Sequence, residues 1–168
     1  MNSEELRSKQ APLKEQYSQS PDSALYTLHA EGRIGEDVSC SISTGKALIE
    51  AGLHTATGGS GLQACSGDML LQALVACAGV TLSAVATALE IPFQSGSIRA
   101  EGDLDFRGTL GISKEVPVGF REIRLFIELD SPAPPEKISK LLELTERYCV
   151  VLQTLRSPVR VETVCNCG

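Results

Sequence analysis

Aromatic residues are scarce in this chain: it has no tryptophan, and phenylalanine and tyrosine make up only 4% of its 168 residues. Because single-stranded nucleic acids bind largely by stacking their bases on aromatic side chains, this scarcity argues against such a surface. The formal net charge of −6 argues against the same partner and against an anionic membrane surface, since both select basic proteins. The composition therefore predicts neither a nucleic-acid partner nor a membrane partner.

The first ten residues lack the apolar core of a signal peptide, which predicts a cytoplasmic location, where thiols stay reduced. Histidine is rare, with only His29 and His54, and neither lies near a cysteine in the sequence. A Cys-x-x-Cys pair is also missing, so the residues predict no metal site and no resident cofactor. Cysteine itself is abundant, with six residues: Cys40, Cys65, Cys77, Cys149, Cys165 and Cys167. In a reducing compartment such cysteines are core residues, metal ligands or redox centres.

Charged residues are absent between Asp68 and Glu90, where alanine, leucine and valine dominate. We therefore predict a long helix over residues 65–90, with Asp68 as its N-cap or in its first turn and Pro92 ending it. The run is long enough to suggest a membrane span, but polar residues interrupt it and no basic cluster flanks it. A helix that is apolar on nearly every face predicts burial on nearly every face, by a sheet or a partner chain. Cys77 lies in the middle of this helix.

The whole chain predicts an α+β fold with a mainly antiparallel sheet and segregated helices. Residues 1–22 form a polar arm, either a short surface helix or a mobile tail, and residues 23–168 form a single domain. A helical spacing of apolar residues predicts one helix over residues 136–155, with Cys149 inside it. Residues 44–54 fit either a helical turn or a strand. Alternation of apolar and polar residues predicts strands over residues 24–31, 38–43, 97–106, 120–129 and 159–164.

Two segments together resemble the signatures of the OsmC/Ohr family. The first, with a glycine-rich loop, an acid, an alanine-rich apolar run and a cysteine, is GGSGLQACSGDMLLQALVACAGVTL, and the second is ERYCVVLQTLRSPVRVE. They occur in the family's order, separated by two predicted strands, and the resemblance covers roughly residues 24–165. It implies an OsmC-like fold, in which a curved, mainly antiparallel sheet surrounds a long buried central helix within an intertwined homodimer.

The resemblance also implies a thiol-dependent peroxidase that reduces organic hydroperoxides with electrons from an external dithiol. By position, Cys77 is the peroxidatic cysteine and Cys149 is the resolving cysteine. A thiolate nucleophile needs stabilisation, which the family obtains from an arginine held by an acid. Asp68 stands at the position of the acid, and Arg33, in the turn predicted after the first strand, is our candidate for the cation. Alternative candidates for the cation are Arg147 and Arg156.

The chain departs from the family's pattern at two positions. Val150 stands where proline often follows the second cysteine, and Cys65 stands where serine or proline is usual. Cys65 precedes a helix N-terminus, so it is either a third redox partner or a loop cysteine without a role. Two alternatives stay open: an OsmC-fold redox sensor or small-molecule binding protein with little turnover, and a thiol-rich metal-binding protein. The latter would use Cys65, Cys165 and Cys167, whereas Cys40 is predicted to be a core residue.

Overall fold

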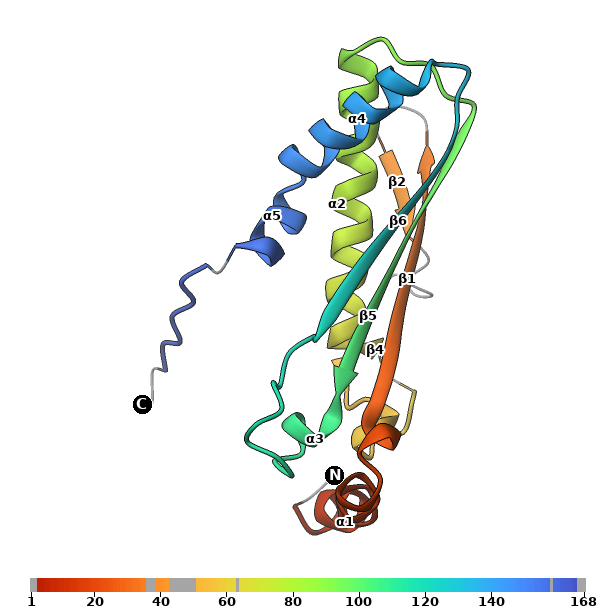
Figure 1. Cartoon of the computed structure of the whole chain (residues 1–168). Helices are drawn as coiled ribbons and strands as arrows, with labels where there is room; N and C mark the ends of the chain where they lie inside the picture. The colour runs from red at the N-terminus through yellow and green to blue at the C-terminus, as the bar shows by residue number, and fades with distance from the viewer. Residues whose placement is uncertain (1–2, 36–38, 43–50, 63, 158, 166–168) are drawn as a thin grey trace.

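The computed structural model describes residues 3–35, 39–42, 51–62, 64–157 and 159–165; the side chains of residues 3–7, 9–10, 26–35, 39–42 and 51 lie outside this description. The helices and strands follow one another as shown in Figure 1. In chain order they are α1 (Ser3–Gln19), the 3-10 turn η1 (Pro21–Ala24), β1 (Leu25–Gly35), β2 (Ser39–Ile42), β3 (Ala51–Gly52), the 3-10 turn η2 (Thr55–Thr57), β4 (Ala64–Cys65), α2 (Ser66–Ala88), β5 (Ser95–Asp105), α3 (Phe106–Thr109), β6 (Glu122–Asp130), α4 (Pro135–Tyr148) and α5 (Val150–Arg156).

Four strands form one antiparallel sheet in the order β2-β1-β5-β6 (Figure 1). The strands predicted at residues 24–31 and 38–43 correspond to β1 and β2, which pair antiparallel with Ile34 opposite Cys40. Strands β5 and β6 pair with Ala100 opposite Leu125, while β3 and β4 form a separate parallel pair. The predicted α+β class, with an antiparallel sheet and a long helix, is confirmed.

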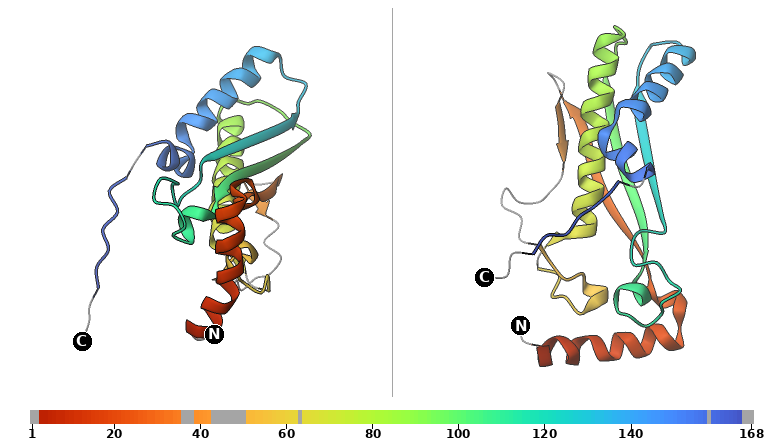
Figure 2. Two further views of the ribbon diagram at one scale, coloured as in Figure 1. Left: turned by 60° about the horizontal axis from the view of Figure 1, so that its bottom comes forward. Right: turned by 90° about the vertical axis from the view of Figure 1, so that its left-hand side faces the viewer.

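Helix α2 packs lengthwise on one face of this sheet (Figure 2). Because alternate residues of a strand point to opposite faces, the apolar alternation of β5 turns Ile98 toward the helix, where it is fully buried with Leu71 and Leu74. A second core near the end of α2 joins Leu82 to Leu141 of α4. The sheet and α4 therefore fix the helix that carries Cys77 from two sides.

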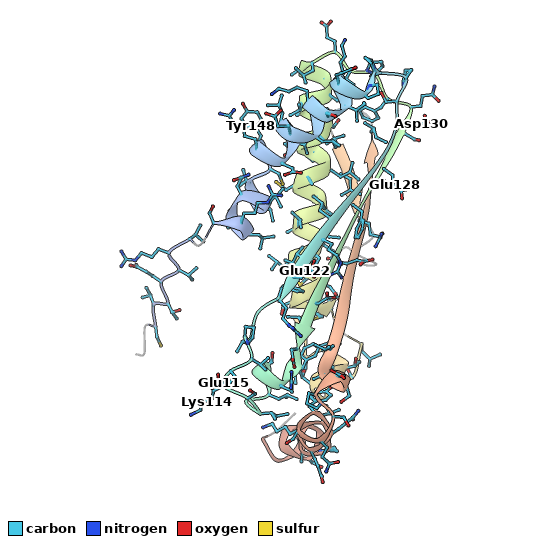
Figure 3. All side chains as sticks on the ribbon, viewed as in Figure 1. Lys114, Glu115, Glu122, Glu128, Asp130 and Tyr148 are labelled. Carbon is cyan, nitrogen blue, oxygen red and sulfur yellow. The ribbon has the colours of Figure 1, made fainter. Side chains whose placement is uncertain are left out.

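The other face of the sheet is charged. Arg124 of β6 pairs with Asp103 of β5 at 2.6 Å, and Arg99 lies over the ring of Phe126. Glu122, on the same strand, is also exposed (Figure 3). Such solvent-accessible ion pairs contribute little to stability, so the apolar side that faces the helices carries the packing of the domain.

Helix α2 is long and apolar enough to span a membrane, and among the described helices it alone is so. Its packing on the sheet identifies it as the core helix of the domain. In the single chain the sheet, α4 and α5 cover only part of this helix, so its burial on nearly every face stays a prediction that requires a partner chain. Leu70 and Val80 are 38% and 41% exposed. We call the exposed row formed by Leu70, Ala73, Val80 and Ala84 the outer stripe of α2.

The sequence left open whether the N-terminal arm is a surface helix or a mobile tail, and the structure shows a helix. Helix α1 crosses the end of the molecule (Figure 2). Tyr17 anchors it: this side chain is fully buried, and its hydroxyl donates a hydrogen bond of 2.8 Å to the Ala56 carbonyl. A buried tyrosine whose hydroxyl is hydrogen-bonded holds α1 on the domain. The polar sequence of the arm gave no sign of this contact.

Strand β1 is longer than predicted, so Arg33 lies in the strand and not in the predicted turn. Residues 32–35, which were assigned to a turn, belong to β1, so Arg33 lies inside this strand, with its backbone opposite Ser97 of β5 and Ser41 of β2. Pairing with strands on both sides outweighs the low strand propensity of glycine. Of the ambiguous residues 44–54, residues 44–50 lie outside the described part, and Ala51–Gly52 is β3.

The predicted strand over residues 159–164 is wrong. This segment has no regular secondary structure and runs away from the body of the molecule (Figure 1). Val161 and Val164 are 81% and 80% exposed. Alternation alone does not make a strand, which also needs a hydrogen-bonded neighbour, and the described part of the chain pairs none with this segment.

Candidate active site

The two cysteines of the predicted pair meet between α2 and the junction of α4 with α5. Cys77, in the middle of α2, is half-buried, and Cys149, between α4 and α5, is fully buried. Each thiol shifts the pKa of the other, both pack into one core cluster, and both are free cysteines. Segments more than seventy residues apart in sequence thus bring two reduced cysteines together.

The predicted single helix over residues 136–155 is wrong at Cys149, where the backbone leaves the helical path. Cys149 has a ψ of 104°, which ends α4 at Tyr148 and starts α5 at Val150. In an unbroken helix, the Val150 N–H would bind the Glu146 carbonyl, but the Gln153 side chain donates to that carbonyl instead, at 2.8 Å. The apolar spacing of the sequence continues across this break and conceals it.

The break frees backbone N–H groups for the two sulfur atoms. The first intrahelical bond of α5 runs from the Gln153 N–H to the Cys149 carbonyl at 2.9 Å, so the preceding N–H groups have no partner inside the helix. The N–H groups of Val151 and Val150 lower the pKa of Cys77, and those of Leu152 and Val151 lower the pKa of Cys149. Hydrogen-bond donors that a continuous helix would have consumed therefore surround the thiol pair.

The two thiols differ in acidity. Burial raises the pKa of Cys77, but the Val151 N–H, the Cys149 thiol, the Thr81 hydroxyl and the Val150 N–H outweigh it, so the pKa lies below its ordinary value. For Cys149, burial raises the pKa to about 11, and the neighbouring Cys77 sulfur adds to this rise. The pair is therefore arranged so that Cys77 ionises first, while Cys149 keeps its proton.

The predicted acid lies too far along α2 to touch Cys77. Asp68 is in the first turn of α2, after the N-cap Cys65, which decides between the two positions predicted for it. Nine residues of helix separate it from Cys77, about 13.5 Å along the axis. Asp68 can therefore influence the thiol only through a group that bridges this distance.

The arginine candidates lie in different surroundings. The side chain of Arg33 lies outside the described part of the chain. Arg147 is 5.5 Å above the ring of Tyr148, an exposed residue of α4 (Figure 3), and Arg156 pairs with Glu146 at 2.8 Å. Among the described residues, the main groups that lower the pKa of Cys77 are neutral donors. Sequence reasoning missed these donors; the signal available for Thr81 was its place one helical turn after the cysteine.

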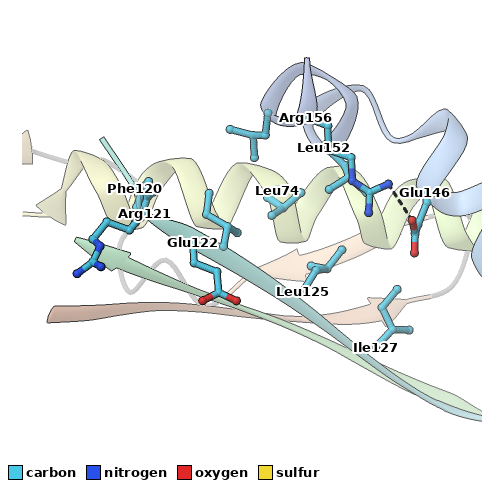
Figure 4. A pocket seen from close by; sticks show the side chains of 11 residues that line it. Leu74, Phe120, Arg121, Glu122, Leu125, Ile127, Glu146, Leu152 and Arg156 are labelled. Atoms are coloured by element: carbon cyan, nitrogen blue, oxygen red, sulfur yellow. Dashed lines mark hydrogen bonds and ion pairs between the residues drawn. The ribbon is translucent and has the colours of Figure 1, made fainter. Parts of the chain in front are cut away.

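A pocket of about 380 Å³ lies between α2, β6 and the α4–α5 junction, and its lining residues do not include Cys77 or Cys149 (Figure 4). Leu74, one turn before Cys77, and Leu152, just after Cys149, form part of its wall. The other lining residues are Phe120, Arg121, Glu122, Ile123, Leu125, Ile127, Glu146, Leu155 and Arg156. An apolar interior with charged residues at its edge suits a small organic molecule with one polar end.

Phe120 closes one end of this pocket and depends on a glycine. A Cβ atom at Gly102 of β5 would lie 2.5 Å from the Phe120 ring and 3.3 Å from Leu71. Only glycine leaves room for the ring to approach the strand this closely. The shape of the pocket is thus set by a residue that does not line it.

The remaining cysteines do not join the pair. Cys65 is half-buried at the N-cap of α2, where its side chain makes no capping hydrogen bond, and Cys165 is exposed in the C-terminal segment. The described residues contain no group of three or more metal-binding side chains. The side chain of Cys40 and the whole of Cys167 lie outside the described part of the chain.

Comparisons with known proteins agree with this architecture. The chain is similar to an OsmC-like hydroperoxide resistance protein from Jannaschia sp., with a TM-score of 0.62 and 17% identity over 86% of this chain and 95% of that one. It is also similar to an OsmC-like protein from Mycoplasma pneumoniae, with a TM-score of 0.51 and 23% identity over 80% of this chain and 86% of that one. A search of curated protein sequences found no match. Residues 59–164, more than half of the chain, match the OsmC-like protein family, and the chain therefore belongs to that family.

Proposed function

We propose that the chain is a thiol peroxidase that reduces organic hydroperoxides through Cys77 and Cys149. The observation that carries this proposal is that a thiol of lowered pKa and a buried thiol of raised pKa lie in one core cluster. A thiolate is the nucleophile in peroxide reduction, and a protonated thiol beside it is positioned to resolve the oxidised product. One of the structurally similar proteins is described as a hydroperoxide resistance protein, which supports the same reaction class.

The reaction proceeds in three balanced steps. The Cys77 thiolate attacks the distal oxygen of the hydroperoxide; the S–O bond forms, the O–O bond breaks, and the alkoxide leaves and takes up a proton from solvent to become an alcohol. The Cys149 sulfur then attacks the sulfenic acid of Cys77, forming a disulfide and releasing water. An external dithiol finally reduces this disulfide by exchange and is itself oxidised to a disulfide.

The pocket supports an organic substrate over hydrogen peroxide. Its wall contains apolar side chains from α2, α5 and β6, including Leu74, Leu125 and Leu152 (Figure 4). Burying an alkyl or aryl group against such a wall gains about 25 cal/mol for each Å² of apolar area removed from water. Hydrogen peroxide has no such group, so we expect it to react more slowly than organic hydroperoxides.

Asp68 and Arg33 keep their proposed roles as an acid–cation pair that adds to the stabilisation of the Cys77 thiolate. Asp68 would act through the arginine, because its own distance along α2 is too large for contact. We also expect the protein to work in the cytoplasm, where dithiol reductants are maintained.

A homodimer is part of the proposal. The outer stripe of α2 leaves an apolar row uncovered in the single chain, with Leu70 and Val80 at 38% and 41% exposure. Val150, at the start of α5, is 70% exposed on the neighbouring helix. A second copy of the chain, packed helix on helix, would remove these apolar residues from water and cover the open side of the thiol site.

The test is turnover of cumene hydroperoxide by the pure protein with dithiothreitol as reductant, followed by loss of the peroxide. We expect turnover in the wild type and none in Cys77→Ser, whereas Cys65→Ser, a matched change of a half-buried cysteine in the same core, stays active. Undiminished turnover in Cys77→Ser would refute the mechanism.

A redox sensor is the second candidate, and one observation favours it. In the described part of the chain, the leading groups that stabilise the Cys77 thiolate are neutral, which makes a weaker activator than a paired arginine. A sensor would form the Cys77–Cys149 disulfide once with one equivalent of peroxide and would recycle poorly with dithiothreitol. Sustained turnover excludes it.

A further inference from the structure

The ring of Phe120 is held in place by strand β5. The Arg121 N–H donates a hydrogen bond of 2.8 Å to the Asp103 carbonyl, which fixes the backbone next to Phe120 on this strand. Asp103 directly follows Gly102, and a Cβ atom at Gly102 would lie 2.5 Å and 2.6 Å from two carbons of the Phe120 ring. These distances are well below van der Waals contact, so the ring can occupy this place only over a residue without a side chain.

An apolar wall connects this ring to the thiol pair. Figure 4 shows Phe120 at one end of the pocket and the Glu146–Arg156 ion pair at the other, with Leu74 between them. Leu74 precedes Cys77 by three residues on α2, so the two side chains are neighbours on the surface of that helix. The thiol pair, Leu74 and Phe120 all belong to one core cluster. A molecule that reacts at Cys77 can therefore extend along Leu74 toward the ring.

The distance from Cys77 to the ring selects for the length of that molecule. A Cβ atom at Gly102 would also lie 3.3 Å from Leu71, so the ring is close to this residue of α2. Leu71 precedes Cys77 by six residues, which is about 9 Å along the helix axis. A hydroperoxide with its distal oxygen at Cys77 reaches Phe120 only through an extended organic group. A cumyl group carries a phenyl ring beyond the peroxide carbon, whereas a tert-butyl group ends at its methyl groups.

We propose that Phe120, packed on Gly102, is a specificity-determining residue whose ring contacts the far end of an extended organic group such as cumyl. This inference rests on the proposed function, in which Cys77 attacks the hydroperoxide. Two closely packed aromatic rings attract each other beyond the area that they bury, so an aryl group gains more from this wall than a short alkyl group does. Gly102 acts through Phe120 and is a positioning residue.

The experiment measures kcat/KM for cumene hydroperoxide, tert-butyl hydroperoxide and hydrogen peroxide at saturating dithiothreitol. Gly102→Ala displaces the ring, and Phe120→Leu removes the ring while keeping an apolar side chain. Gly119→Ala is the matched control, because it adds the same methyl group next to Phe120 in the sequence, where a Cβ atom meets nothing within 4 Å. Phe120→Leu adds no atom at the crowded strand, so it provides the test if Gly102→Ala folds poorly.

We expect Gly102→Ala to lower kcat/KM for cumene hydroperoxide about tenfold, the low end of what one methylene is worth in an apolar pocket. Phe120→Leu should lower the same value by less. Both variants should keep the wild-type values for tert-butyl hydroperoxide and hydrogen peroxide, and Gly119→Ala should keep all three. A purely structural defect would lower all three values together; such a uniform fall, or an unchanged ratio of cumene to tert-butyl hydroperoxide, would overturn the inference.

Binding of 2-phenyl-2-propanol, the alcohol formed from cumene hydroperoxide, separates this inference from the proposed function because it needs no turnover. NMR titration should show weaker binding by Gly102→Ala and Phe120→Leu than by the wild type and Gly119→Ala. If the wild type turns over hydroperoxides with the same selectivity as both variants, the function stands and the role of Phe120 fails. If the wild type consumes none but binds the alcohol in this order of affinity, the contact with the ring stands and the proposed function fails.

Discussion

The two cysteines of the site lie in one core cluster, yet their surroundings shift their pKa values in opposite directions. Cys77 lies on an unbroken helix and gains donors from a neighbouring one, whereas Cys149 lies at the break that releases those donors and is itself fully buried. Burial acts against ionisation at both sites, and the number of hydrogen bonds to the sulfur decides which thiol ionises first. A break in a helix is thus able to activate a cysteine on the helix beside it.

Removing either thiol should have the largest effect on the difference between the two cysteines. In Cys149→Ala the sulfenic acid of Cys77 has no partner, so we expect multiple turnover with dithiothreitol to be lost and a stable sulfenic acid to form. The loss of one donor should also raise the pKa of Cys77. Labelling with dimedone and peptide mass spectrometry detects the sulfenic acid; unlabelled Cys77 together with normal turnover would contradict the assignment of roles.

The reverse variant tests the other half of the comparison. The Cys77→Ala variant removes the neighbouring sulfur that helps to raise the pKa of Cys149. We therefore expect this pKa to fall from about 11 toward its ordinary value of 9.0. It should stay above 9.0, because burial remains as the largest cause. Alkylation of Cys149 as a function of pH gives this value, and a pKa at or below 9.0 would show that burial is not what holds it.

A proline at position 150 sharpens the comparison by removing one donor from Cys77 alone. Val150 is the first residue of α5, where proline fits the helix and lacks only the N–H that lowers the pKa of Cys77. We expect the alkylation midpoint of Cys77 to rise by about one pH unit in Val150→Pro, with Cys149 nearly unchanged. Val150→Ala, which keeps the N–H, is the control; a similar shift in both variants would point to altered packing.

Removing the proposed cation should have the smallest effect. We expect Arg33→Ala to raise the midpoint of Cys77 by less than about one pH unit, since neutral donors already hold the thiolate. Arg99→Ala, which removes an arginine from the charged face of β5, is the matched control and should change nothing. An effect of Arg33→Ala larger than that of Val150→Pro would make the cation, rather than the backbone donors, the main activator of Cys77.

The sequence predicted the parts of the fold that depend on burial of alternating residues. Ile98 and Ile127 lie opposite each other on the apolar face of the sheet, as the alternation in their strands requires. The resemblance to the family also singled out Cys77 and Cys149, which the structure places in one core cluster, while their catalytic roles stay a prediction. Local pattern and burial agree in these regions, so simple periodicity was sufficient.

The sequence could not predict features that depend on contacts between distant segments. The apolar spacing runs straight through Cys149, so it gave no sign of the break that supplies Val150 and Val151 as donors. The alternation of residues 159–164 predicted a strand, but no described strand pairs with this segment. Arg33 was assigned to a turn, whereas pairing with two neighbouring strands extends β1 past it.

The most direct test of the central claim is the product formed when the reduced protein meets one equivalent of cumene hydroperoxide. The account predicts that peptide mass spectrometry will find an intramolecular disulfide between Cys77 and Cys149, formed together with one equivalent of the alcohol. Recovery of both cysteines as free thiols after the peroxide has been added, or a disulfide that joins other residues, would contradict it.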